Sequence, residues 1–406
     1  MLAPILIYGI PFEFVLFALT LAGIALFHHH TLPIALAGLA AVVAYKLAFT
    51  GFKFGPGVGG LAELMRHEWV TLANLFLLLM GFALLSRHFE ESRIPDEMPA
   101  LLPHDWKGGT LLLCIVFVLS GFLDNIAAAL IGGTAARHVF RGKVHVGYLA
   151  AIVAAANAGG AGSVVGDTTT TMMWIDGVSP LTVLDAYVGA VAALLVFAIP
   201  ASILQQRFSP IVGKPPSGLK IDRARVVIVA IVLLAAMSAN VTANVYFPIV
   251  QDHLPVLGLA VWIALLVTAV LRRPDWSVLP ESFKGTIFLL ALVLAASMMP
   301  VDKLPAASAS TAFGLGIVSA VFDNIPLTAL ALKQGGYDWG FLAYAVGFGG
   351  SMVWFGSSAG VALSNMYPEA KSVGLWLRGG WPIVIAYVVG FVAMLALVGW
   401  HPDAPH

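Results

Sequence analysis

The 406-residue chain has the composition of a protein that lies in a lipid bilayer, with 60% hydrophobic and only 10% charged residues. Soluble proteins are about 45–50% apolar and about 25% charged. The 21 Lys and Arg residues are balanced by 21 Asp and Glu residues, so no basic field is present for nucleic acid, and the single Cys allows no disulfide framework or thiolate metal site. The composition excludes a soluble enzyme, a nucleic-acid-binding protein and a disordered scaffold. It predicts an all-α polytopic membrane protein.

Apolar runs of the length that crosses a bilayer, roughly 20 residues, recur along the whole chain. They predict about ten transmembrane helices, near 4–27, 32–50, 69–87, 147–174, 183–203, 224–248, 255–271, 285–299, 340–366 and 379–399.

Two further apolar stretches, 110–139 and 311–332, carry an Asp-Asn pair near the middle. A helix over the whole of 110–139 would be about 45 Å long, against a hydrocarbon core of about 30 Å. Two half-length arms that meet at a polar tip fit this length better, so we expect two re-entrant hairpins. A single crossing by each stretch remains the alternative.

The distribution of Lys and Arg predicts which side of the membrane each loop occupies. With the polar connection 204–223 in the cytoplasm, most of the 21 basic residues lie on the inner side, whether the two Asp-Asn stretches are hairpins or spans. The chain is therefore expected to be a multi-pass membrane protein with the lipid bilayer as a partner.

An internal repeat divides the chain into halves 1–205 and 222–400, joined by a cytoplasmic linker at 206–221. SGFLDNIAAAL (120–130) matches SAVFDNIPLTAL (319–330), and NAGGAGSVVGDTTTT (157–171) matches GFGGSMVWFGSSAG (347–360). Each half holds five spans and one hairpin. Because five is odd, the second half enters the membrane upside down, which predicts an inverted-repeat transporter.

The matching glycines fall inside two apolar helices at 147–174 and 340–366, which we expect to be unwound at these points. Such paired breaks indicate a transporter binding site, because freed backbone groups cannot be satisfied by hydrocarbon. Close helix packing is the usual role of a single Gly pair, but it explains two pairs in register less well. The expected breaks are at Gly159, Gly160, Gly166, Gly349, Gly350 and Gly356.

Three carboxylates, Asp124, Asp167 and Asp323, lie in these segments with no Lys or Arg nearby in sequence. An ionised carboxylate in mid-membrane costs several kcal/mol unless it is paired, protonated or bound to a metal ion. Loss of water favours the protonated form and an arriving cation favours the ionised form. This alternation suits cation/proton exchange, with all three as candidate Na+ ligands. Helix capping is the simpler role for the two Asp-Asn pairs.

Neutral oxygen ligands are available around the carboxylates. Among the four threonines that follow Asp167, we expect two to bond back to the preceding turn and Thr168 or Thr169 to face the site. The further candidates are Asn125, Asn324, Ser120, Ser319, Ser351, Ser357 and Ser358.

The two motif pairs resemble those of the NhaD-type sodium/proton antiporters, which belong to one transporter superfamily with citrate carriers and arsenite permeases. The resemblance covers most of residues 110–399. It implies an inverted repeat with two re-entrant hairpins and two unwound helices, transport of Na+ and H+ without a cofactor and a location in the bacterial inner membrane, and it allows for a homodimer. By motif match, it implies transport roles for Asp124, Asn125, Asp167, Thr169, Asp323 and Asn324.

Three other functions compete with exchange of Na+ or Li+ for protons. A sodium-coupled carrier of citrate or another anion would use the helix N-termini at the hairpin tips, but the three acids would repel a carboxylate. An intramembrane aspartyl protease needs a Gly-x-Gly-Asp setting, and Val164 replaces the earlier Gly. A passive channel fits poorly with closed hairpin tips.

Overall fold

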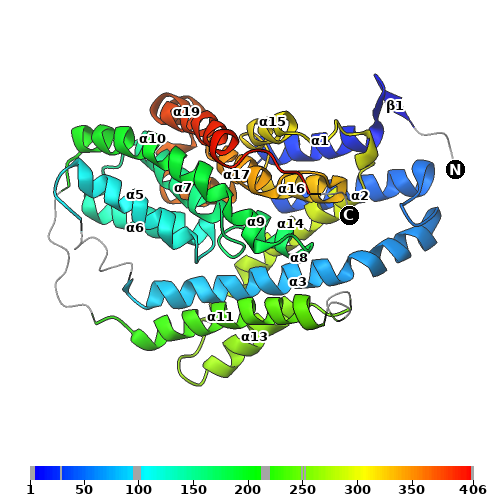
Figure 1. Ribbon diagram of the computed structural model, residues 1–406, viewed down its shortest axis with the longest axis horizontal. Coiled ribbons are helices and arrows are strands. Elements are labelled where there is room, and N and C mark those ends of the chain that lie inside the picture. Colours follow the sequence, from blue (N-terminus) through cyan, green and yellow to red (C-terminus); the bar gives the residue numbers. More distant parts are fainter. Residues whose placement is uncertain are drawn as a thin grey trace. The chain divides into compact units, whose positions relative to one another are not determined.

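The computed structural model describes residues 5–27, 30–94, 102–211, 220–247, 250 and 253–403, and these residues are almost entirely helical (Figure 1). The only strands in this part of the chain form a short hairpin, β1 (Leu6–Ile7) and β2 (Ile10–Pro11). Half of the expected linker 206–221, residues 212–219, lies outside the described residues. The chain forms two compact units, and each takes residues from both sequence halves.

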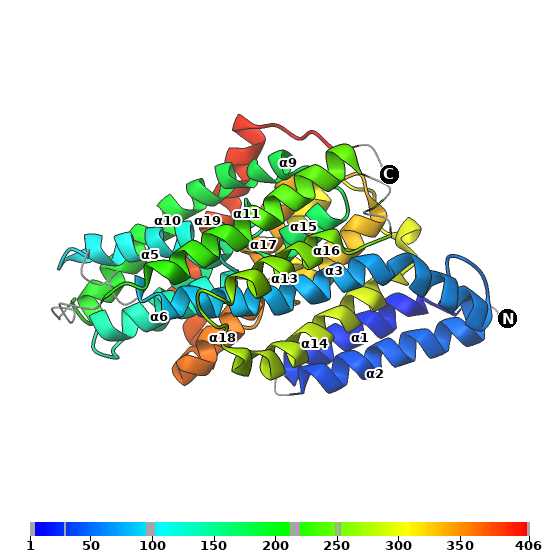
Figure 2. The same ribbon diagram turned by 90° about the horizontal axis from the view of Figure 1, so that it is seen from below.

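The first unit comprises residues 1–88, 224–304 and 329–334. Within it α2 packs against both α1 and α14 (Figure 2). Two hydrogen bonds join α13 to α3: the Gly258 N–H donates to Asn74 Oδ1 at 3.0 Å, and the Trp262 indole donates to the Leu77 carbonyl at 2.8 Å. Its main elements are α1 (Phe12–Leu26), α2 (Thr31–Tyr45) with a π-helical extension (Lys46–Thr50), α3 (Gly57–Glu91), α11 (Arg223–Tyr246), α13 (Val256–Thr268) and α14 (Leu279–Ser297), with the 3-10 turns Trp276–Val278 and Val301–Lys303.

The first unit corrects two of the expected spans. The chain forms the β hairpin before α1, so the helix begins at Phe12 and not near residue 4. Helix α3 is 35 residues long and begins at Gly57, well before the expected 69. The part of α3 before residue 69 contains Glu68. A carboxylate lowers the hydropathy of the segment around it, so the expected span began only after this residue. Lys333 pairs with this carboxylate at 2.8 Å, which compensates its burial.

The second unit comprises residues 89–223, 305–328 and 335–406. Long helices α10 and α19 pack side by side in it, and α7 packs against α5, α10 and α19 (Figure 1). All residues of α17 are buried, as are all residues of α7 from its second position on, so these two helices form the core. Its elements are α5 (Trp106–Ser120), α6 (Asn125–Val139), α7 (Val146–Ala161), α8 (Thr168–Ile175), α9 (Pro180–Leu184), α10 (Ala186–Phe208), α15 (Ala309–Ser319), α16 (Asn324–Gln334, of which the part from Ala329 belongs to the first unit), α17 (Trp339–Gly349), α18 (Ser358–Met366), the 3-10 turn Pro368–Lys371 and α19 (Val373–Leu397).

Long apolar helices mark the chain as a multi-pass integral membrane protein. Five described helical segments have the length and composition to cross a bilayer: Thr31–Thr50, Gly57–Glu91, Pro180–Phe208, Trp276–Ser297 and Val373–Leu397. By contrast, the helices in the segments with the Asp-Asn and Gly-Gly motifs are interrupted. Helices α5 and α6 pack on each other across a short connection, and six residues separate the end of α7 from the start of α8. At 1.5 Å per residue, the 15 residues of α5 span only about 22 Å.

The glycines explain why the two repeats pack in the same way. A Cβ atom on Gly159 would overlap the Phe117 carbonyl, and one on Gly349 would overlap the Gly316 carbonyl. Helices α7 and α17 therefore approach α5 and α15 backbone to backbone. Where each helix breaks, a Cβ on Gly160 would lie 2.6 Å from the Gly166 carbonyl oxygen, and one on Gly350 would lie 2.6 Å from that of Gly356.

We predict that Gly159→Ala and Gly349→Ala each destabilise the protein by about 1–3 kcal/mol, because the new methyl group meets a backbone carbonyl that cannot rotate away. The measurement is the apparent melting temperature of the purified protein in detergent. Gly314→Ala in α15 is the matched control, since nothing lies within 4 Å of its added Cβ. Equal melting temperatures for all three variants would contradict the packing argument.

Candidate functional site

Four half-length helices of the second unit begin at the predicted polar residues. Asp124 precedes α6, Asp167 precedes α8, Asp323 precedes α16 and Ser357 precedes α18. Hydrogen bonds and electrostatic contacts connect these four helix starts. We call the connected side chains the polar centre; they are Asp124, Asn125, Asn157, Asp167, Thr169, Asp323, Asn324, Ser351, Ser357 and Ser358.

Asn157, in the middle of buried helix α7, joins both repeats within the polar centre. Its Nδ2 donates to Ser351 Oγ and to Ser357 Oγ, each at 3.0 Å, and its Oδ1 accepts from Asn125 Nδ2 at 3.2 Å. Its side chain is completely buried. Asn157 was not among the residues predicted from the sequence. Its position two residues before the Gly-Gly pair, in an otherwise apolar helix, indicates a buried polar role.

Asp167 lies in the middle of the three carboxylates. Its Oδ1 accepts from the Thr169 backbone N–H at 3.3 Å and its Oδ2 accepts from Asn324 Nδ2 at 3.4 Å. It also interacts electrostatically with Asp124 and with Asp323. The side chain is only 2% exposed, so the charges of its neighbours act on it with little screening by water.

The two hairpin-tip carboxylates differ in how far capping accounts for them. Asp323 Oδ1 accepts from the Ile325 N–H at 3.0 Å, which is a cap, while Oδ2 accepts from Ser358 Oγ at 3.1 Å. Asp124 stands at the N-cap position of α6, where the backbone N–H groups of Asn125 and Ile126 interact with its carboxylate. Capping therefore accounts for part of the surroundings of both carboxylates, and the contacts with Ser358 and Asp167 go beyond it.

The polar centre contains no basic counterpart to these acids. None of the ion pairs found among the described residues involves Asp124, Asp167 or Asp323. In the same part of the chain no three His, Cys, Asp or Glu side chains are grouped so as to hold a metal ion together. A bound cation would therefore combine one or two carboxylates with neutral oxygens.

The threonines after Asp167 divide as the sequence predicts. Thr170 Oγ1 donates to the Ser163 and Asp167 carbonyls, and Thr171 Oγ1 donates to those of Val164 and Asp167. Thr169 Oγ1 is buried and interacts with the Asp167 carboxylate, and no other group among the described residues accepts its proton. The hydroxyl oxygen is therefore available to an ion bound at Asp167. Thr168, the first residue of α8, is half-buried.

The two serines one turn before the tips have a packing role in the structure. Ser120 Oγ donates to the Ala156 carbonyl at 2.6 Å, and Ser319 Oγ donates to the Val346 carbonyl at 2.7 Å. Both are fully buried. They join α5 to α7 and α15 to α17 in the same way, so their hydroxyl protons are already committed.

The repeats differ at one position beside Asp167. When the Gly-Gly breaks are matched, Gly347 of α17 stands where Asn157 stands in α7. A Cβ on Gly347 would lie 3.3 Å from Asp167 Oδ2. The missing side chain thus leaves space for the Asp167 carboxylate, which takes the place that an amide would occupy in a symmetric site.

Known proteins similar to this chain are transporters by their names. A family model described as "Citrate transporter" matches residues 10–349. Sodium/proton antiporter 1 of Arabidopsis thaliana is 27% identical over 84% of this chain, which spans only 65% of that relative's length. The Na(+)/H(+) antiporters NhaD of Vibrio cholerae and Alkalimonas amylolytica are 25% and 26% identical, each over 82% of this chain and over 80% and 78% of their own lengths.

These relatives confirm the resemblance to NhaD-type antiporters, and all are named as transporters and none as an enzyme. The match to the family model covers well over half of the chain. The chain therefore belongs to the citrate transporter family.

Proposed function

We propose that the chain is a secondary active transporter that exchanges Na+ or Li+ for protons across the membrane by alternating access at the polar centre. The observation that carries the proposal is the buried Asp167 carboxylate, which interacts with two further acids and with the Thr169 hydroxyl and has no basic partner among the described residues. Relatives named as sodium/proton antiporters support it.

The charges around the site favour a single monovalent cation. Each helix N-terminus carries about half a positive charge, so the four that meet here supply about +2. Three ionised carboxylates supply −3, which leaves about −1 in a region of low dielectric constant. One Na+ ion or one proton neutralises this remainder. Binding of either species at the same carboxylates makes the two compete, and this competition couples their transport.

The proposed Na+ shell combines charged and neutral oxygens. Asp167 and one of the carboxylates of the two Asp-Asn pairs, Asp124 or Asp323, supply charge, and Thr169 Oγ1, beside Asp167, supplies a neutral oxygen. Carbonyls at the breaks after Gly159–Gly160 and Gly349–Gly350, together with the Asn125 and Asn324 amide oxygens, complete the shell. Asn157 holds Ser351 and Ser357 in position. The protein needs no cofactor for this cycle.

The same proposal extends to the membrane topology. Stretches 110–139 and 311–332 form re-entrant hairpins, and 147–174 and 340–366 are unwound transmembrane helices of an inverted repeat with about ten spans. The short arms that end at polar tips support it. A bacterial inner membrane and a homodimeric assembly are part of the proposal, and the curated relatives come from plants as well as bacteria.

A sodium-coupled citrate or other anion carrier is the second candidate function. The family description favours it, as do the four helix N-termini at the polar centre. Against it, three acids and no base line the centre in the described residues, and they would repel a carboxylate substrate.

The two functions are distinguished by measuring the transmembrane pH gradient in everted vesicles with a quenched fluorescent amine. We expect NaCl or LiCl to dissipate the gradient, and KCl or citrate to leave it unchanged. Asp323→Asn should abolish the sodium response while the protein still folds, because Asn keeps the oxygen that caps α16. Asp302→Asn, an exposed acid, is the control. Sodium-dependent citrate uptake without a cation response would establish the second function instead.

Thr169→Val tests the proposed hydroxyl ligand. The change keeps the side-chain shape and removes an oxygen whose one partner among the described residues is Asp167, so we expect the half-saturating Na+ concentration to rise about tenfold with little change in the melting temperature. Thr171→Val should behave in the opposite way, since its hydroxyl is already bonded to two carbonyls: stability falls by about 1 kcal/mol and the Na+ response stays. Equal Na+ responses in both variants would remove Thr169 from the shell.

Gly347→Ala tests the space around Asp167. The added methyl group would lie 3.3 Å from Asp167 Oδ2 and 3.4 Å from Ala161 Cβ, so the carboxylate must move by a few tenths of an ångström while the helix stays intact. We expect a higher half-saturating Na+ concentration and a changed ratio of Na+ to Li+ response. Wild-type values for both, with Gly314→Ala as the reference, would show that this glycine has no part in selectivity.

A further inference from the structure

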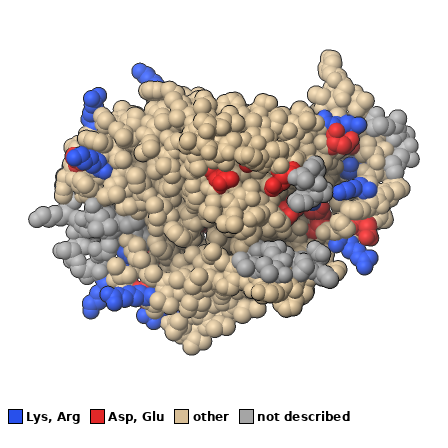
Figure 3. All heavy atoms as spheres, in the orientation of Figure 1, with Lys and Arg blue, Asp and Glu red and all other residues tan. Residues whose placement is uncertain are grey.

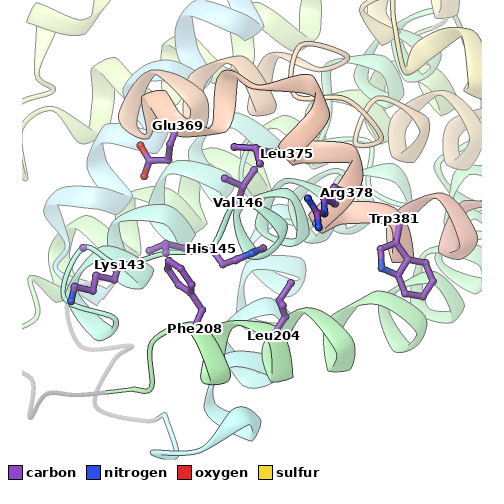
Figure 4. A pocket seen from close by; sticks show the side chains of 12 residues that line it. Lys143, His145, Val146, Leu204, Phe208, Glu369, Leu375, Arg378 and Trp381 are labelled. Carbon is purple, nitrogen blue, oxygen red and sulfur yellow. The ribbon is translucent and has the colours of Figure 1, made fainter.

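A cavity of about 720 Å³ lies in the second unit, and its lining residues are all outside the polar centre. The start of α7, the end of α10 and the first turns of α19 enclose it, together with the loop before α7 (Figure 4). No residue of the polar centre lines it. Its function is therefore separate from ion binding.

The lining combines two cations with an apolar surface. Lys143 and Arg378 supply positive charge, and Leu204, Phe208, Leu375 and Trp381 supply apolar area. The one acid in the lining is Glu369, whose carboxylate points away from Arg378 in Figure 4. Phe208 is 56% and Trp381 57% exposed. Aromatic surface beside the two cations is therefore open to an apolar ligand.

His145 adds a polar donor to the same cavity. It is the residue before α7, and its Nδ1 accepts a hydrogen bond from the Gly147 N–H at 3.0 Å. Burial lowers the pKa of His145, so the ring is neutral at pH 7 and carries its proton on Nε2. The Phe208 ring packs on it edge-to-face, with centroids 5.2 Å apart. With His145 neutral, the charges that line the cavity are those of Lys143, Arg378 and Glu369, and their sum is positive.

The cavity lies at the basic end of the unit. Lys and Arg side chains stand out at the left of Figure 3, where Figure 1 shows α10. The distribution of basic residues assigns this end to the cytoplasmic side. Trp residues also concentrate at membrane interfaces, and Trp381 lies in the third turn of α19 and is more than half exposed. A ligand here meets both the headgroup layer and the first acyl carbons.

We propose that this cavity binds the phosphate headgroup of an anionic phospholipid from the cytoplasmic leaflet. Lys143 and Arg378 contact the phosphate, and the acyl chains lie along Trp381, Leu375 and Leu204. Basic pockets between membrane helices on the cytoplasmic side suit such headgroups, and the apolar wall excludes a purely soluble anion as the best-fitting ligand. The bound lipid joins the start of α7 to α10 and α19.

The proposal is tested by native mass spectrometry of the full-length protein in detergent, with phosphatidylglycerol and phosphatidylcholine of identical chains. We expect the wild type to retain phosphatidylglycerol preferentially. Lys143→Gln/Arg378→Gln should weaken this retention at least about tenfold, because each juxtamembrane cation contributes about fivefold. Arg141→Gln/Arg207→Gln is the matched control, since both cations are exposed near the same end and do not line the cavity.

Three results would overturn the proposal. Equal loss in the two double variants would mean that charge at this end attracts lipid without a defined site. Equal retention of phosphatidylcholine would mean an apolar groove with no headgroup selectivity. Displacement of phosphatidylglycerol by millimolar inorganic phosphate would assign the cavity to a soluble anion. The readout is lipid binding, so it is independent of whether the protein exchanges sodium for protons.

Discussion

The structure depends on placing three carboxylates at the start of half-length helices, where water and basic side chains are both scarce. Asp124, Asp167 and Asp323 are partly or fully buried, and the helix dipoles offset only part of their combined charge. The fold must therefore break four apolar helices to supply these N-termini. A cation or a proton completes the charge balance, and this requirement gives the protein its proposed function.

Glycine makes that arrangement sterically feasible. Gly159 and Gly349 allow buried helices to touch the hairpins backbone to backbone, and Gly160 and Gly350 allow each chain to fold back at its break. The same contacts appear in both repeats, which indicates that they follow from the motif and not from local accident. The repeats then diverge at Gly347, where absence of a side chain gives Asp167 its position. Packing is symmetric, whereas the ion site is not.

The sequence predicted helix interruptions near the Gly-Gly and Asp-Asn motifs and the back-bonding of two threonines, because glycine pairs, Asp-Asn pairs and hydroxyl runs act through local geometry. It placed the breaks too early, since Gly159, Gly160 and Gly349 are still helical and α7 and α17 end only at Ala161 and Gly349. It missed Asn157, whose role depends on partners 32 and 200 positions away in the chain. It also misplaced the starts of α1 and α3. Hydropathy does not recognise a β hairpin, and it rejects a helical turn whose Glu68 is neutralised by Lys333, far away in sequence.

The central claim, that Na+ and protons compete for the same carboxylates, is tested most directly by proton release from the purified protein in a weakly buffered solution with a pH indicator. The account predicts that saturating Na+ releases protons from the wild type, that K+ and citrate release none, and that Asp167→Asn reduces the release. Sodium binding without proton release, or proton uptake on addition of citrate, would contradict it.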